Sequence, residues 1–470
     1  MAGLDSKNIV FVMLDTVRAD MLSTYGGSIA MPGLDRLARR GTRYDLAIAP
    51  GTYTLPSHLS IFLGRKVSRI YGMKRTGMKF SDTMTDPFLK KSRYADGEVT
   101  LAKMMEYFGY RSALFSNNPF VSEPTGLAAG FSYSSNMFVD RVLKSKKLSV
   151  RAVLHLVQND ATRKNLIRLA YGISSALPSR SIDSLYLHLR KKLNRHFSRE
   201  YGYYELDKGA SETNRMVCKY AAHEAEQRNF VFVNYMEGHE GYPTNLITRR
   251  YIEQDKWLHM IGDTDGDAIG VIKGAYGKRL EYLDSKVSEL LAALRREGML
   301  DDATVIVSSD HGQAFMEHGQ MFHNIHPYNE VSRVPLVLAE FRNGRQANNP
   351  SVVEEPFSLT NLNKLILGSA SATAGLAVSE HTGITEVWDA YLLRLFRERS
   401  ANADRIYRKK VELDGPVTAV FGGRYKLVHH HRRSKDELYD LADDPAEENN
   451  IIDRSRSMAH MLLREGAIVG

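Results

Sequence analysis

The chain has very little cysteine and no long apolar run. Cys218 is the single cysteine among 470 residues, so no disulfide can form within the chain, and redox chemistry is not expected of it. No uninterrupted apolar stretch reaches the length of about 18 residues that a transmembrane helix needs. Residues 1–7 are polar and lack the basic start and long apolar core of a secretory signal. From these absences we expect a cytoplasmic protein.

Positive charge is concentrated in one segment rather than spread over the chain. The net charge is +8, yet residues 141–200 alone carry 14 Lys and Arg against three acidic residues, so the remainder is net negative. Leucines at helical spacing between these charges predict a basic helical insertion over about residues 141–215. Only three aromatic residues lie among residues 141–200, without any nucleic-acid motif, so no nucleic-acid partner is expected.

Two roles for this basic insertion stay open. It can engage an anionic surface such as lipid headgroups, which would hold the protein peripherally at a membrane. Alternatively, its apolar face packs on the core of the protein and its charges are merely solvated.

Short apolar runs alternate with segments whose leucines recur at helical spacing. The runs are continuous and rich in β-branched residues, as in strands buried on both faces of a parallel sheet. This alternation predicts an α/β fold with a mostly parallel central sheet flanked by helices. We expect strands at residues 9–14, 112–115, 230–233, 305–307 and 425–428, and helices at residues 32–40, 101–108 and 280–294.

Polar residues follow several predicted strands, at the edge where open α/β sheets bind their ligands. Asp15 comes directly after the first strand, and Asp310 with His311 follows another. Asp15 alone can equally cap a following helix. An aspartate and a histidine directly after a buried strand have little packing purpose and suit a hard cation or zinc.

A turn-rich stretch at residues 49–58 precedes an apolar helix and contains Thr54. Its hydroxyl groups can simply cap that helix, but the free N–H groups of a helix N-terminus also stabilise oxyanions. A later loop contains His318, His323 and His326. Each of these histidines alone is a weak signal, because loop histidines are mostly surface residues.

Together, and in their order along the chain, these motifs resemble the sulfatase branch of the alkaline phosphatase superfamily. The resemblance extends over nearly the whole chain except the basic insertion. It is carried by Leu14-Asp15-Thr16 with Arg18-Ala19-Asp20, Thr54-x-Pro56-Ser57, His239-x-x-Tyr242-Pro243, Ser309-Asp310-His311-Gly312 with Glu317-His318-Gly319, Arg333-Val334-Pro335-Leu336, and, near the C-terminus, Gly423-Arg424-Tyr425 with Glu437-Leu438-Tyr439-Asp440.

The resemblance implies one divalent metal ion bound by Asp15, Asp310 and His311, with Thr54 at the nucleophile position and bound to the same ion. A cation beside a hydroxyl oxygen lowers the pKa of that hydroxyl and makes it a competent nucleophile.

The resemblance also implies that His239 contacts the non-bridging oxygens of the substrate and that His323 stands where lysine is usual. A nearby histidine can protonate the leaving oxygen. We expect His323 in this role, with His326 as its rival.

Four departures from the sulfatase pattern fall at the site. Sulfatases proper have Cys or Ser at the nucleophile position, where it is oxidised to formylglycine; Thr54 cannot yield that aldehyde because its Cβ carries a methyl group. His58 replaces an arginine, Thr16 replaces an aspartate, and Asn117-Asn118 replaces a Lys-Trp-His stretch. These changes resemble the threonine-nucleophile branch, which includes phosphoglycerol and phosphoethanolamine transferases and some phosphodiesterases.

The same branch generally uses manganese or zinc, whereas sulfatases generally use calcium. Because an imidazole ligand favours a transition metal, we expect Mn or Zn, with Ca as the other candidate. His58, Asn117, Asn118 and His326 are the expected substrate-binding residues, and they make the pocket less cationic than one that grips sulfate. Such a pocket suits a phosphodiester, a phosphonate or a phospho-headgroup on a small molecule, lipid or glycan.

The sequence therefore predicts a metal-dependent hydrolase or transferase of phosphate-type esters with a threonine nucleophile. Two alternatives stay open: a sulfuric ester hydrolase that works without formylglycine, and a non-catalytic sulfatase-like protein that binds an anion. We expect residues 1–355 to form the catalytic α/β domain, interrupted by the basic insertion, and residues 356–470 to form a smaller C-terminal α+β subdomain.

Overall fold

The computed structural model describes most of the chain outside the basic insertion. The described residues are 8–67, 98–123, 125–137, 206–240, 266–323, 326–370, 382–387, 417–431 and 435–468. Residues 141–205 of the predicted insertion lie outside them. Its last residues, from Ala210 onward, belong to a helix that packs on the central sheet.

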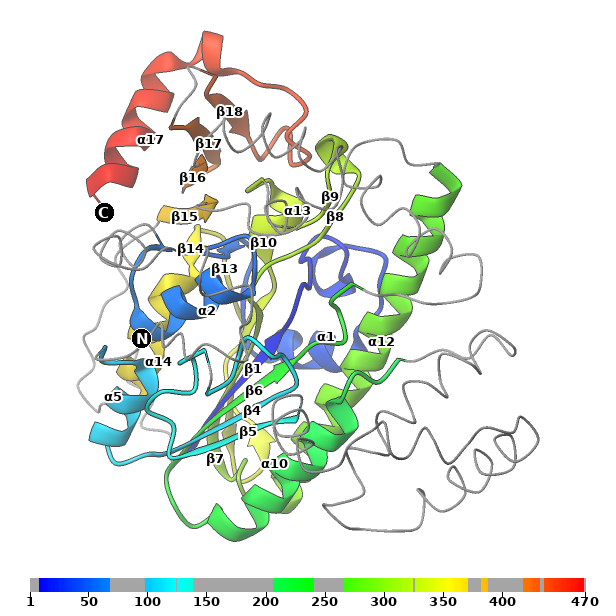
Figure 1. Cartoon of the computed structure of the whole chain (residues 1–470), viewed down its shortest axis with the longest axis vertical. Coiled ribbons are helices and arrows are strands. Elements are labelled where there is room, and N and C mark those ends of the chain that lie inside the picture. The colour runs from blue at the N-terminus through cyan, green and yellow to red at the C-terminus, as the bar shows by residue number, and fades with distance from the viewer. Residues whose placement is uncertain are drawn as a thin grey trace, which may run out of the picture.

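A nine-stranded, mostly parallel sheet forms the centre of the molecule, as the sequence predicts (Figure 1). Its strand order is β13-β2-β11-β7-β1-β6-β4-β5, with β12 paired to β11. The five strands from β7 to β5 run parallel, and β11 is antiparallel to β7. The strands are β1 Asn8–Leu14, β2 Thr42–Tyr44, β4 Arg111–Ser116, β5 Tyr133–Asn136, β6 Asn229–Tyr235, β7 Asp302–Ser309, β11 Leu336–Arg342, β12 Arg345–Gln346 and β13 Ser351–Val353.

Strand β1 lies in the middle of this sheet because nearly all of its side chains are apolar and all seven residues are buried. Alternate residues point to opposite faces of a strand. Val10 and Val12 enter one apolar core, whereas Ile9 and Phe11 enter the other. A continuous apolar run is therefore the expected sequence of a strand that is covered on both sides.

Helices cover both faces of the sheet (Figure 1). Helices α1, α10 and α12 pack on one face, and α2, α5 and α14 pack on the other. The helices are α1 Pro32–Arg39, α2 Thr54–Leu63, α5 Leu101–Tyr107, α10 Ala210–Glu224, α12 Gly266–Arg296, α13 Asn329–Ser332, α14 Leu362–Ala370 and α17 Arg456–Ile468, with short 3-10 turns at Ser23–Tyr25, Glu317–Gly319, Leu359–Asn361 and Ile452–Arg454. None of the helices in the described part of the chain is long and apolar enough to cross a membrane.

A four-stranded antiparallel sheet forms a separate C-terminal layer, in the order β15-β16-β17-β18. Helix α17 packs on this sheet through Ala459 and Leu462. Strand β14 and helix α14 come after the predicted boundary at residue 355, yet they pack on the larger unit. The remaining strands are β3 Ala47–Ile48, β8 Ala314–Phe315, β9 Met321–Phe322, β10 Arg333–Val334, β14 Phe357–Ser358, β15 Thr382–Val387, β16 Val417–Gly422, β17 Tyr425–His430 and β18 Glu437–Asp440.

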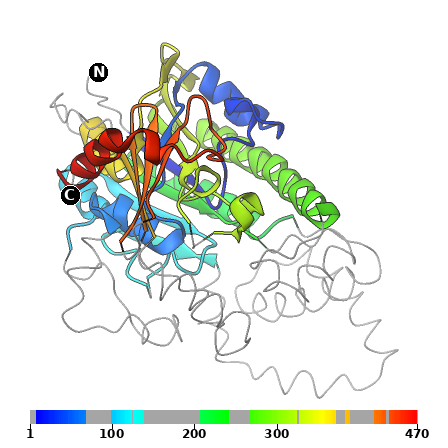
Figure 2. The same cartoon turned by 90° about the horizontal axis from the view of Figure 1, so that it is seen from above.

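The C-terminal layer contacts the turn that leads into α2. The Glu386 backbone N–H donates to Pro50 O at 3.0 Å, and the Thr385 hydroxyl donates to Ala49 O at 2.6 Å. Seen from above, α17 lies on the same side as α2, opposite to α12 (Figure 2). Through the hydrogen bonds of Thr385 and Glu386, strand β15 supports the backbone just before Thr54.

Candidate active site

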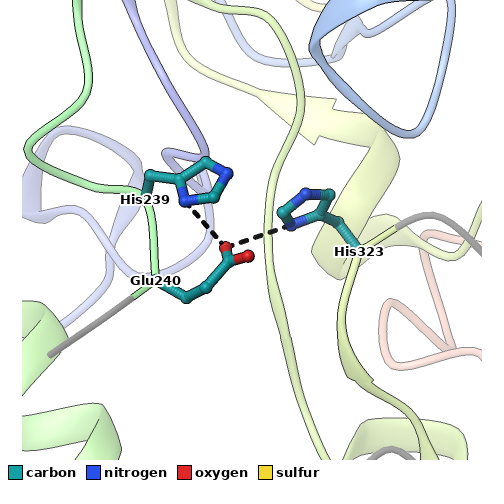
Figure 3. Close-up of side chains that lie close together, drawn as sticks. All are labelled: His239, Glu240 and His323. Atoms are coloured by element: carbon teal, nitrogen blue, oxygen red, sulfur yellow. Dashed lines mark ion pairs between the residues drawn. The ribbon is translucent and has the colours of Figure 1, made fainter. Parts of the chain in front are cut away.

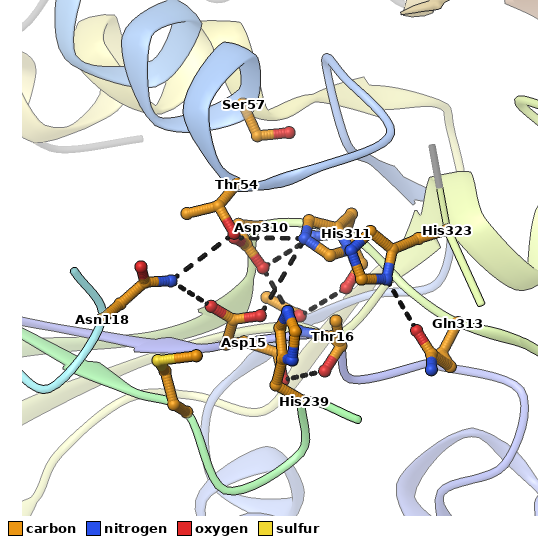
Figure 4. A network of polar contacts seen from close by, with 12 residues as sticks. Asp15, Thr16, Thr54, Ser57, Asn118, His239, Asp310, His311, Gln313 and His323 are labelled. Carbon is orange, nitrogen blue, oxygen red and sulfur yellow. Dashed lines mark hydrogen bonds and ion pairs between the residues drawn. The ribbon is translucent and has the colours of Figure 1, made fainter. Parts of the chain in front are cut away.

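Polar side chains from four parallel strands meet at the carboxyl edge of the central sheet. Two groups stand out as possible metal ligands: His239, Glu240 and His323 (Figure 3), and Asp15, Asp310 and His311 (Figure 4). Parallel strands end at the same edge, so loops that are far apart in the chain deliver their side chains to one place.

Asp15, Asp310 and His311 form the inner group, and all three are fully buried. His311 Nε2 lies 3.5 Å from Asp310 Oδ2 and 3.9 Å from Asp15 Oδ1. Within the described residues, none of these three atoms makes a hydrogen bond. Buried polar atoms without partners are costly, so this arrangement of two oxygens and one nitrogen fits a divalent cation.

The electrostatics of the inner group are consistent with a cation site. Burial raises the pKa of Asp15 to about 6, and the charge of Asp310 adds to that shift. Burial also raises the pKa of Asp310 to about 7, whereas it lowers the pKa of His311. Two carboxylates in a small dry space resist being charged together unless a positive charge lies between them.

In each carboxylate, one oxygen accepts hydrogen bonds from the protein, and these bonds orient the other oxygen toward the inner group. Asp310 Oδ1 accepts from the backbone N–H groups of His311 at 2.9 Å and Thr16 at 3.3 Å. Asp15 Oδ2 accepts from Asn118 Nδ2 at 2.6 Å. Thr16 has a φ of 60°, a left-handed conformation that is unusual for a β-branched residue. Such strain is often concentrated at functional sites.

Thr54 is the first residue of α2, and only 4% of it is exposed. Its Oγ1 lies 3.5 Å from Asn118 Nδ2, the same group that holds Asp15. The turn before it is closed by Ser57, whose hydroxyl donates to Gly51 O at 3.0 Å and accepts from Gly51 N at 3.2 Å. This turn puts the Thr54 hydroxyl beside the inner group, at the positive end of a helix dipole.

Two of the expected substrate-binding residues, His58 and Asn117, use their polar side-chain atoms in contacts with other residues of the site. His58 is fully buried, and its Nδ1 lies 2.9 Å from Thr54 O and 3.5 Å from Asp310 Oδ2. Burial lowers the pKa of His58 to about 4, so its ring is neutral. Asn117 Oδ1 accepts from Met236 N at 3.1 Å and so joins the ends of β4 and β6. Both residues link elements of the site.

His239, Glu240 and His323 form the outer group. Glu240 Oε2 lies 3.0 Å from His239 Nδ1 and 3.7 Å from His323 Nδ1 (Figure 3). The His323 and His311 rings are 4.5 Å apart, so the two groups adjoin (Figure 4). Burial alone would lower the pKa of His239, but the charge and hydrogen bond of Glu240 outweigh burial and raise it.

His326 is not a member of either group of possible ligands. Its ring stacks on Tyr328 at a centroid distance of 5.4 Å, and Tyr328 also packs against Tyr439 of the C-terminal layer. The sequence thus identifies most of the residues that converge, whereas His326, the rival to His323 as the acid, stacks on Tyr328.

The sequence analysis missed one member of the outer group, Glu240, and two of its neighbours, Gln313 and Lys208. Glu240 directly follows a motif histidine, and this adjacency could have been noticed. Gln313 Oε1 lies 2.8 Å from His323 Nδ1. Lys208 is half-buried, and its Nζ donates to the backbone oxygens of His239 at 2.5 Å and Glu240 at 2.9 Å. It falls within the predicted insertion, so no local pattern points to its position at the site.

A mostly parallel sheet with carboxylates, imidazoles and a helix-terminal hydroxyl gathered at one edge defines an α/β protein of the alkaline phosphatase type. Comparison with known families makes this class specific. A family model described as Sulfatase matches residues 7–371. The chain belongs to the sulfatase family, whose members usually bind a divalent metal ion.

Individual relatives agree with this assignment at low identity. An N-acetylglucosamine-6-O-sulfatase of Bacteroides thetaiotaomicron is 23% identical over 95% of this chain and 83% of its own length. An arylsulfatase of Clostridium perfringens is 21% identical over 95% of this chain and 90% of its own length. The solved structure of a phosphonate monoester hydrolase of Agrobacterium radiobacter has a TM-score of 0.64 at 16% identity, covering 98% and 96% of the two chains. That likeness supports the fold.

Proposed function

We propose that this protein is a metal-dependent hydrolase or transferase of phosphate-type esters, with Thr54 as its nucleophile. The observation that carries the proposal is the position of Thr54 beside three buried ligand atoms that make no hydrogen bond among the described residues. Threonine cannot be converted to the aldehyde that sulfatases proper use, so its own hydroxyl is the available nucleophile.

The inner group would hold one divalent cation through Asp15, Asp310 and His311, with Thr54 Oγ1 beside it. A nitrogen ligand among oxygens favours Mn or Zn, and Ca remains the other candidate. When bound, the cation would withdraw electron density from the Thr54 oxygen and from the ester oxygens.

In the proposed reaction, the Thr54 hydroxyl loses its proton to solvent and its oxygen attacks phosphorus. A new O–P bond forms, the P–O bond to the leaving group breaks, and the leaving oxygen takes a proton from His323. Water or an acceptor alcohol then attacks the phosphothreonine and regenerates the hydroxyl. The backbone N–H groups at the start of α2 stabilise negative charge on the ester oxygens.

The remaining site residues would hold these groups and the substrate. His239 would donate to the non-bridging oxygens. Asn118 and Asn117 would line the substrate side, and His58 would fix the Thr54 backbone beside Asp310. His326 remains the rival acid, but its stacking on Tyr328 favours His323 for protonation of the leaving oxygen.

The substrate would be a phosphodiester, phosphonate or phospho-headgroup on a small molecule, lipid or glycan. The structural likeness to a phosphonate monoester hydrolase supports this chemistry. The second candidate is sulfate ester hydrolysis without formylglycine, because the family and the named relatives are sulfatases.

The test is a panel of nitrophenyl phosphate monoester, phosphate diester, phosphonate and sulfate, each with Mn²⁺, Zn²⁺ or Ca²⁺ added to chelator-treated protein. Metal-dependent turnover of the diester or phosphonate that Thr54→Ala removes supports the proposal. A preference for the sulfate supports the second candidate. Absence of both turnover and bound metal would leave a non-catalytic anion-binding protein.

The basic segment of residues 141–205 lies outside the described residues, and its role is proposed from its charge. We propose that it engages an anionic surface, since each basic residue near such a bilayer contributes on the order of 1 kcal/mol. Cosedimentation with anionic vesicles but not neutral ones, weakening as salt rises, is expected. Equal binding to both vesicle types would contradict it.

A further inference from the structure

Glu240 touches both histidines of the outer group through one oxygen. Its Oε2 lies within ion-pair distance of both rings, 3.0 Å from His239 Nδ1 and 3.7 Å from His323 Nδ1 (Figure 3). The side chain of Glu240 is 11% exposed, so little water competes for the carboxylate. One acid therefore faces the same nitrogen of two different rings.

The contacts of these rings determine which nitrogen carries the proton. His239 Nδ1 faces a carboxylate oxygen, and His323 Nδ1 faces that carboxylate and Gln313 Oε1 at 2.8 Å. Carboxylate and amide oxygens only accept hydrogen bonds. Each Nδ1 must then be the donor, which leaves the opposite ring nitrogen, Nε2, for the reacting groups.

The backbone that carries Glu240 is held independently of its side chain. Lys208 Nζ donates to the backbone oxygens of His239 and Glu240. The adjoining Glu237 carboxylate accepts from the N–H groups of Lys208 at 2.9 Å and Ala210 at 3.0 Å, at the start of α10. The His239–Glu240 pair is therefore fixed to a helix N-terminus, and the Glu240 carboxylate has a defined direction.

From these contacts we propose that Glu240 is the shared positioning residue of the site. It keeps a proton on Nδ1 of His239 and His323 and turns both Nε2 atoms toward the substrate, so that each Nε2 donates when its ring also carries the second proton. The assignment rests on the proposed function for the roles of the two histidines. The orientation itself is a property of the folded chain and can be measured without any substrate.

The first experiment reads the ring protonation directly. Nitrogen-15 histidine is incorporated into the full-length protein, and one-bond and long-range couplings identify the protonated ring nitrogen. His239→Asn and His323→Asn spectra assign the two residues. We expect Nδ1–H for both rings in the wild type and loss of that preference for His239 in Glu240→Gln. A ring protonated on Nε2 but not on Nδ1 in the wild type would overturn the proposal, whether or not the protein hydrolyses phosphate esters.

The second experiment uses kinetics on whichever ester the protein turns over. Loss of an orienting carboxylate typically costs about 10- to 100-fold in activity, and for Glu240→Gln we expect it in kcat, with KM changed less than about threefold. Glu240→Asp should recover part of the loss, because it restores a carboxylate. Glu226→Gln, an exposed change in the turn before β6, is the matched control.

Metal content separates orientation from ligation. Wild type and Glu240→Gln should bind the same amount of Zn²⁺ per chain. If the wild type holds two ions and the variant one, His239, Glu240 and His323 are ligands of a second cation and the positioning role is overturned. A loss confined to KM, or an equal loss in Glu226→Gln, would also overturn it.

Discussion

Thr54 is the residue on which the proposed chemistry depends. Its hydroxyl lies at a helix start, next to a carboxylate cluster, and is held in place by Asn118. The residue at this position decides which nucleophile the site can use. Threonine supplies a hydroxyl group, as serine would.

We expect Thr54→Ala to lower kcat by at least about 1000-fold, because covalent catalysis loses its nucleophile. Thr54→Ser should retain part of the activity, since it loses only the methyl group that helps to fix the rotamer. The measurement is turnover of the best nitrophenyl ester, with thermal melting as the control for folding. Near-normal kcat in Thr54→Ala would mean that water is the nucleophile.

The inner carboxylates predict how metal-free protein responds to pH. The pKa values of Asp15 and Asp310 are raised from 3.8 to about 6 and about 7. The folded state therefore binds more protons than the unfolded state, and the stabilisation present below the unfolded pKa is lost as pH rises through the folded pKa values. We expect the chelated protein to melt at lower temperature at pH 7.5 than at pH 5.

Added cation should reverse this trend, because it replaces the protons between the carboxylates. At about 100 times its dissociation constant, a ligand that binds only the folded state stabilises it by about 2.7 kcal/mol. Mn²⁺ or Zn²⁺ should thus raise the melting temperature at pH 7.5 and have little effect at pH 5. Asp310→Asn should abolish the rise, and an unchanged rise in that variant would place the cation elsewhere.

At the scale of elements, the sequence predicts the strands and helices well. The expected strands and helices that fall in the described part of the chain all occur, with ends that differ by a few residues except for α12, which begins earlier. The helices expected in the basic insertion before Ala210 lie outside that part and stay a prediction. Apolar periodicity is a local property, and so is a motif such as Ser309-Asp310-His311-Gly312. What the sequence did not reveal are contacts between distant segments, such as that of Lys208 with His239 and that of Tyr328 with Tyr439 of the C-terminal layer.

The segment around the short turn Glu317–Gly319 joins the site to the C-terminal layer. His318 Nδ1 lies 3.0 Å from Glu330 Oε1, its Nε2 lies 3.1 Å from Glu447 O, and its ring stacks on Tyr328 at 3.9 Å. Burial lowers the pKa of His318, but the hydrogen bond and charge of Glu330 outweigh it and raise the pKa to about 9.

The raised pKa of His318 predicts a second pH dependence of the stability of the protein, at alkaline pH. Its folded pKa lies above the ordinary 6.5, so the stabilisation is complete below that value and is lost as pH rises through about 9. We expect the melting temperature to fall between pH 7 and 9.5, and less steeply in His318→Gln. An unchanged slope in that variant would show that other groups cause the fall.

At the scale of the whole molecule, a buried ion pair of the C-terminal layer holds Asn329 at the start of α13. Lys426 Nζ lies 2.5 Å from Glu447 Oε1, and both side chains are fully buried. Lys426 also donates to Asn329 Oδ1 at 3.2 Å, and Glu447 accepts from Asn329 N at 2.6 Å. In the sequence these two charges look like surface residues, because nothing local shows that they are covered.

We expect Lys426→Met to destabilise the protein by about 3–5 kcal/mol, because it leaves a buried carboxylate without its partner. Adding Glu447→Gln should recover part of this loss. The matched control is Arg424→Met at the neighbouring exposed ion pair with Asp440, where we expect little change because solvent screens exposed charges. Urea unfolding gives all three values, and equal losses in Lys426→Met and Arg424→Met would refute the assignment.

The contact of β15 with the turn before Thr54 has a consequence for how the protein can be shortened or recombined. The segment that matches the family ends at residue 371, but the strand that braces Ala49 and Pro50 begins at Thr382. A chain cut at the end of the match would keep every proposed ligand and lose the support of its nucleophile turn. It would also uncover Ile48 and Tyr328, which pack on Val417, Phe421 and Tyr439. The C-terminal layer can therefore be exchanged between relatives only together with the turn at Ala49 and Pro50 that it contacts.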